Sequence, residues 1–71
     1  MVEADGLPTE PQEIFELIVK ADEKLKYATA DRSDARRRQA TDLLTQAMEA
    51  ARAIGNEGLV QQAELRLADL A

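Results

Sequence analysis

The chain contains no cysteine, histidine or tryptophan. Without cysteine it can form no disulfide, iron–sulfur cluster or thiolate zinc site, and without histidine it lacks the commonest metal ligand and general base. The spacing of the remaining serine, threonine, tyrosine and lysine residues favours no pairing of a nucleophile with a carboxylate. The sequence therefore predicts a protein that is not an enzyme and that holds no metal or other cofactor.

Long apolar runs are also missing. The stretch from Ile14 to Val19 is interrupted by Glu16 and is far shorter than the roughly 20 residues that a membrane helix needs. The N-terminus carries Glu3 and Asp5 where a secretory signal would carry basic residues. We therefore expect no membrane partner and a cytoplasmic location.

Aromatic residues are scarce, since Phe15 and Tyr27 are the only two among 71 residues, and the net charge is −5. Proteins that bind nucleic acid combine a basic surface with aromatic side chains on which bases stack. The sequence therefore predicts no nucleic-acid partner. We expect Phe15 to lie in the core and Tyr27 to lie at the edge of an apolar helix face.

Large apolar side chains are few as well. Thirteen of the hydrophobic residues are alanine, which leaves nineteen larger ones. A domain of this size gains only about 3–5 kcal/mol from a single core and usually needs a disulfide, a metal or oligomerisation in addition. Because the first two are excluded, the composition points to close packing through alanine and to a protein partner or a second copy of the chain, with a homodimer as one form.

The pattern along the chain predicts three helices. Residues 1–8 show little hydrophobic periodicity and are expected to form a flexible leader, followed by a folded domain over 9–71 with helices at about 10–29, 34–54 and 57–70. Thr9 and Gln12 have the spacing of a capping box, and Pro11 suits a first helical turn. Apolar residues recur at intervals of three and four on each helix. These are Ile14, Ile18, Ala21, Leu25 and Ala28; Ala40, Leu44, Ala47, Ala51 and Ile54; and Leu59, Val60, Ala63, Leu67 and Leu70.

The helix boundaries are set by local residue chemistry. The first two apolar rows are out of phase, which indicates a break near residues 29–34, where Asp31 or Ser33 could cap the second helix. Gly55 suits a left-handed cap and Asn56 can cap the third helix. Such a tight turn joins antiparallel neighbours. The predicted fold is an all-α three-helix antiparallel bundle, which dimerisation or helix exchange at the break could complete.

The residues Ala40, Leu44 and Ala47 and the segment 47–56, which ends in Gly-Asn, resemble the second helix of a tetratricopeptide repeat. The segment 59–70 is similar to the first helix of a following repeat, so the resemblance covers residues 40–70. It implies a helical hairpin followed by one further helix. Because repeat units bury a continuous core only when stacked, it also implies a partner or self-association.

Charge is unevenly distributed: residues 1–19 carry −5, residues 20–38 carry +3 and residues 39–71 carry −3. The basic side chains near the break would attract a carboxylate-bearing partner or a phosphate, or else would form a solvated face. The predicted partner-binding residues are Lys24, Tyr27, Arg32, Arg36, Arg37 and Arg38, with Lys20 beside them. Apolar residues that flank the main rows, and so could remain exposed, are Tyr27, Leu43, Met48 and Leu65.

These observations favour a small, non-catalytic helical module for protein–protein interaction or assembly. The alternative is a small regulatory adaptor or inhibitor that acts through the acidic segment from Glu3 to Glu16. Reversing the charge of Arg36 to Arg38 would abolish binding under the first hypothesis and leave it intact under the second.

Overall fold

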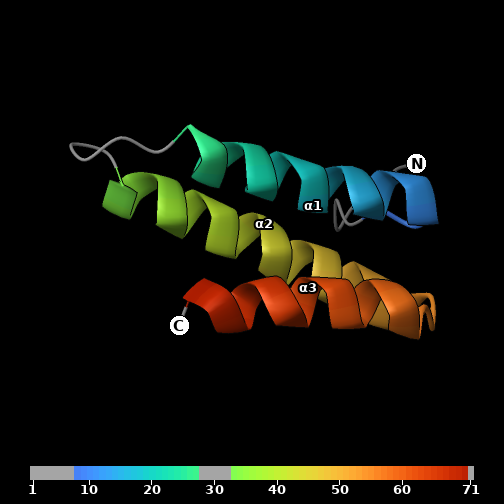
Figure 1. The fold of residues 1–71 in the computed structure, drawn as a ribbon. Helices are drawn as coiled ribbons and strands as arrows, with labels where there is room; N and C mark the ends of the chain where they lie inside the picture. The colour runs from blue at the N-terminus through green and yellow to red at the C-terminus, as the bar shows by residue number, and fades with distance from the viewer. Residues whose placement is uncertain (1–7, 28–32, 71) are drawn as a thin grey trace.

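The computed structural model describes residues 8–27 and 33–70, and within these it contains three helices and no strand. They are α1 (Pro11–Lys26), α2 (Ser33–Ala53) and α3 (Glu57–Leu70). Successive helices run antiparallel, with α2 in the middle (Figure 1). The predicted all-α three-helix bundle is therefore confirmed. Residues 1–7, which make up most of the expected leader, and residues 28–32 at the expected break lie outside the described part of the chain.

Helix α1 begins differently from the expected capping box. Its N-cap is Glu10, whose backbone is extended (φ −108°, ψ 139°) and whose side chain makes no capping hydrogen bond. The cause is Pro11, because the proline ring disfavours helical geometry in the preceding residue. The non-helical cap position therefore falls on Glu10, and the prediction of a Thr9 cap was wrong. Ser33, one of two predicted caps for α2, is instead its first helical residue.

The turn between α2 and α3 has the predicted chemistry. Gly55 has a φ of +73°, a left-handed conformation that glycine adopts without steric cost. The Gly55 and Asn56 N–H groups donate to the carbonyls of Arg52 (3.0 Å) and Ala51 (2.8 Å), which is the hydrogen-bond pattern of a Schellman motif. The Asn56 Oδ1 then accepts a hydrogen bond from the Leu59 N–H (3.1 Å) and caps α3.

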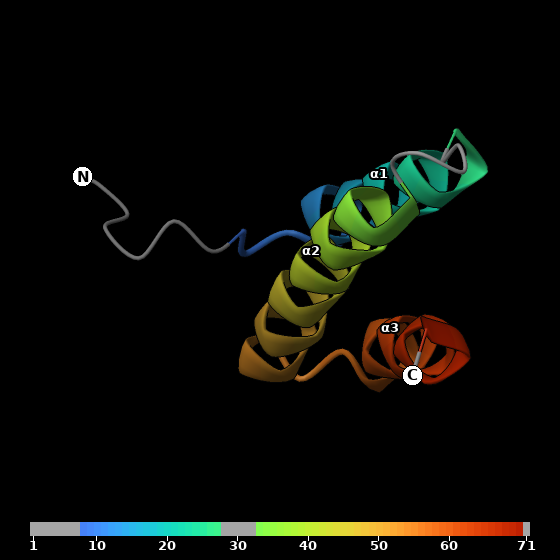
Figure 2. The same cartoon turned by 90° about the vertical axis from the view of Figure 1, so that its left-hand side faces the viewer.

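The core is built largely from alanine. The largest fully buried side chains are those of Ile14, Ile18 and Leu44, and α2 supplies most of the buried positions. Both α1 and α3 contact α2 far more extensively than they contact each other, and the end-on view shows them against different parts of α2 (Figure 2). The fully buried alanines are Ala21, Ala40, Ala47, Ala50, Ala51 and Ala63. Small side chains on facing helices allow their axes to approach closely.

Two ion pairs add links between helices. Arg66 on α3 donates from Nε to both carboxylate oxygens of Asp22 on α1 (3.0 and 3.2 Å). Arg52 on α2 binds Glu64 on α3 at 3.2 Å, where both side chains are about half exposed. Within residues 8–27 and 33–70, the Asp22–Arg66 pair thus provides a polar link between α1 and α3, which contact each other little.

Candidate functional site

The outward side of α1 carries three exposed apolar or aromatic side chains. Phe15 is 49% exposed, Val19 is 37% exposed and Tyr27 is 65% exposed, whereas Ile14, Ile18 and Ala21 on the same helix are buried. Phe15 and Val19 are four residues apart, and Tyr27 lies eight residues further on, so the three follow one slanted row. The structure thus contradicts the prediction that Phe15 lies in the core.

The position of Phe15 follows from helix geometry. Each residue turns an α-helix by about 100°, which points Phe15 well away from the direction of Ile14. A wide interface could still bury both side chains, but α1 packs chiefly against an alanine-rich helix. Only a narrow arc of α1 is covered, and Phe15 falls outside it.

A basic pocket lies at the later turns of α1, beside the start of α2. It has a volume of about 560 Å³ and is lined by Lys20, Glu23, Lys24 and Tyr27 from α1 and by Arg36 from α2. Among the described residues that line it, three are cationic and one is acidic, although the chain as a whole carries −5. This local excess of positive charge attracts an anionic group such as a carboxylate.

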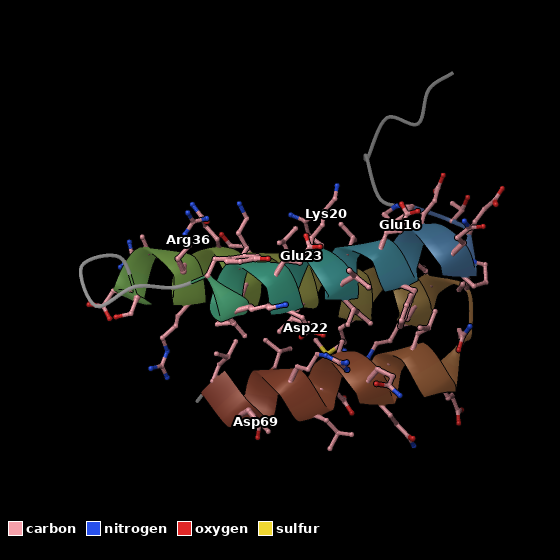
Figure 3. The ribbon with its side chains drawn as sticks, turned by 45° about the horizontal axis from the view of Figure 1, so that its top comes forward. Glu16, Lys20, Asp22, Glu23, Arg36 and Asp69 are labelled. Carbon is pink, nitrogen blue, oxygen red and sulfur yellow. The ribbon has the colours of Figure 1, made fainter. Side chains whose placement is uncertain are left out.

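An apolar groove continues from the basic pocket toward the N-terminus of α1. It has a volume of about 440 Å³, and Lys20 and Glu23 line both features. Figure 3 shows Glu16, Lys20 and Glu23 along one edge of α1, with Arg36 beyond them, while Asp22 lies on the side toward α3. The remaining side chains of the groove are Gln12, Phe15, Glu16 and Val19. We refer to the pocket and the groove together as the outer α1 face.

The structure brings together only some of the predicted partner-binding residues. Lys24, Tyr27 and Arg36 share the basic pocket, but Arg37 points elsewhere and donates to the Leu70 carbonyl at the end of α3 (3.4 Å). Arg38 is exposed and does not line the pocket. Consecutive helical residues point about 100° apart, so these three arginines cannot share one face. Arg32 lies outside the described residues.

The prediction of which apolar residues remain exposed was partly wrong. Leu43 and Met48 are half-buried and pack against the core, whereas Tyr27 and Leu65 (66% exposed) lie on the surface. The sequence analysis did not identify Phe15 and Val19 as exposed residues. The signal was present, because Phe15, Val19, Glu23 and Tyr27 follow one another at intervals of four residues.

In the described part of the chain, no group of three or more acidic side chains gathers closely enough to hold a metal ion. None of the three described helices combines the length and hydropathy that a membrane crossing requires. Comparisons with protein-family models, with curated proteins and with solved structures found no match to this chain.

Proposed function

We propose that this chain is a non-catalytic interaction or assembly module that binds a protein through the outer α1 face. The observation that carries the proposal is the position of the exposed apolar residues. Phe15, Val19 and Tyr27 lie on one side of one helix, and the apolar groove adjoins a pocket with excess positive charge. The tetratricopeptide-like character of the hairpin belongs to the same proposal.

Physical chemistry favours a protein as the ligand. Apolar side chains grouped beside charged ones are typical of a surface whose centre loses water on binding, because burial of apolar area supplies the free energy and charge selects the partner. Aromatic residues dominate such interfaces, and the face presents both aromatic residues of the chain. The pocket and groove are both partly open to solvent rather than enclosed, as is usual for a surface that binds another protein.

Site-specific crosslinking tests the proposal in living cells. A photoreactive benzoyl-phenylalanine would replace Val19 in the full chain, and in a matched control it would replace Glu49, an exposed residue of α2. We expect protein adducts at position 19, with the chain itself or with another protein, several-fold above those at position 49. A second substitution, Phe15→Ser, should remove these adducts and leave the helical circular dichroism signal unchanged.

Equal adduct yields at positions 19 and 49 would refute the proposal, because the outer α1 face would then contact proteins no more than an ordinary surface does. Adducts at position 19 that survive Phe15→Ser would also contradict it, since they would not depend on the apolar row.

A further inference from the structure

Four charged residues follow one edge of α1 in a particular order. Glu13, Glu16, Lys20 and Lys24 are separated by three, four and four residues, so they lie along the same edge of the helix. The two acidic residues come first and the two basic residues follow. Among residues 8–27 and 33–70, the ion pairs join Arg52 to Glu64 and Arg66 to Asp22, so none of these four is paired there.

This order is self-complementary. When the edge is read in the opposite direction, its two basic residues come first and its two acidic residues follow. We propose that a second copy of this chain binds the outer α1 face, with the two α1 helices antiparallel across a two-fold axis. The inference rests on the proposed function and names its partner.

The two-fold arrangement imposes a geometric condition that α1 meets. Across such an axis, the edge of α1 nearer to α2 faces the same edge of the partner's α1. Glu13 then lies beside the partner's Lys24, and Glu16 beside the partner's Lys20. The midpoint of the Glu13–Lys24 pair falls between residues 18 and 19 and that of the Glu16–Lys20 pair falls at residue 18, so Val19 lies close to the axis and near the partner's Val19.

The basic pocket strengthens both ends of this arrangement, which the two-fold axis makes equivalent. Lys24 shares the pocket with Arg36, so the carboxylate of the partner's Glu13 enters a site with more than one cation. A parallel two-fold arrangement would instead turn the charged edges of the two helices to opposite sides of the contact, where Glu16 and the partner's Lys20 could not pair. Charge therefore selects the antiparallel orientation.

The contact is small. Helix α1 has 16 residues and is about 24 Å long at 1.5 Å per residue, so one pair of such helices buries less than the roughly 1,600 Å² of a standard interface. The dimer is accordingly weak, depends on protein concentration and weakens as salt screens its charge pairs.

Sedimentation equilibrium of the purified full chain at low ionic strength tests the inference. Glu16→Lys and Lys20→Glu each turn both symmetry-related pairs into repulsions, and each should weaken association by about tenfold or more. The double variant, with both changes in one chain, should associate as the original does. The control Glu49→Lys changes the net charge as much as Glu16→Lys does but lies on α2, and it should leave association intact.

Mixing supplies a more specific result. The two single variants, each monomeric alone, should form a dimer with each other, because both pairs across the axis are then attractive again. All of the changed residues are exposed, and circular dichroism verifies that each variant is folded.

A chain that keeps the monomer mass at all concentrations overturns the inference, as does a Glu16→Lys variant that associates as strongly as Glu49→Lys. A mixture of the single variants that stays monomeric also overturns it. If the chain is monomeric but position 19 crosslinks to another protein, the proposed function stands and only the second copy is excluded. If position 19 yields no specific adduct, the proposed function itself fails.

Discussion

Replacing Ala47 with leucine should destabilise the fold, although leucine is larger, more apolar and almost as good a helix former as alanine. Ala47 is fully buried in α2, among other buried alanines. If these alanines permit close approach of the helices, three added carbon atoms have no space. Overpacking of this kind costs about 1–3 kcal/mol.

The competing explanation is that alanine is frequent only because it favours helices. In that case the added carbons would find space and be buried at about 0.8 kcal/mol each, which would stabilise the fold by roughly 2 kcal/mol. The two explanations therefore predict opposite signs. Because a domain of this size has only about 3–5 kcal/mol of stability, either shift would be a large fraction of the total.

Urea unfolding followed by circular dichroism at low protein concentration measures the difference. Ala53→Leu is the matched control, because Ala53 is exposed on the same helix. This substitution should change the free energy of unfolding of the protein by less than about 0.5 kcal/mol. Ala47→Leu should also lower the melting temperature by about 4–8 °C for each kcal/mol lost. An Ala47→Leu variant that is at least as stable as Ala53→Leu would refute the reasoning about close packing.

The two remaining predictions also use matched variants. Gly55→Ala should destabilise the fold by about 1–2 kcal/mol, because Gly55 has a left-handed backbone. Gly58→Ala should be neutral or should stabilise the fold by up to about 1 kcal/mol, because its new methyl group would make only an ordinary contact, at 3.6 Å from the Asn56 Oδ1. Thermal unfolding distinguishes these signs, and equal losses would contradict the assigned turn. Arg66→Met should cost about 1 kcal/mol and Arg52→Met less than about 0.5 kcal/mol, because the Arg66 side chain is less exposed and makes more hydrogen bonds. Urea unfolding at low and high salt measures both, and equal losses would exclude a special role for the α1–α3 link.

The parts of the fold that were predicted correctly depend on local chemistry. The recurrence of Leu44, Ala47 and Ala51 at helical intervals identified the buried side of α2, and Gly55 followed by Asn56 identified the turn to α3. Both signals act over a few residues and do not depend on the neighbouring helices. A local effect also explains the misplaced start of α1, because the influence of Pro11 on the preceding residue outweighed the spacing of the expected capping box.

The candidate site was harder to predict because it depends on how helices face one another. The sequence showed a group of basic residues near the break, but the rotation of α2 decides that Arg36 faces α1 while Arg37 reaches the end of α3. The exposure of Phe15 depends on how wide a strip of α1 is covered by α2. Neither the rotation of α2 about its axis nor the width of the covered strip of α1 follows from the spacing of residues along one helix.

The small core and the exposed face of α1 have a common physical origin. Helix α2 contributes mostly alanine to the buried core, and its short side chains leave part of α1 uncovered. Large side chains on this uncovered part of α1, Phe15 and Val19 above all, have no partner surface within the described chain and remain half exposed. The packing that limits the stability of the monomer thus leaves on its surface the apolar groups that a second chain could bury. An antiparallel copy would cover these groups and pair charges of the same helix that have no partner within the described chain, so association through the outer α1 face would stabilise the folded chain.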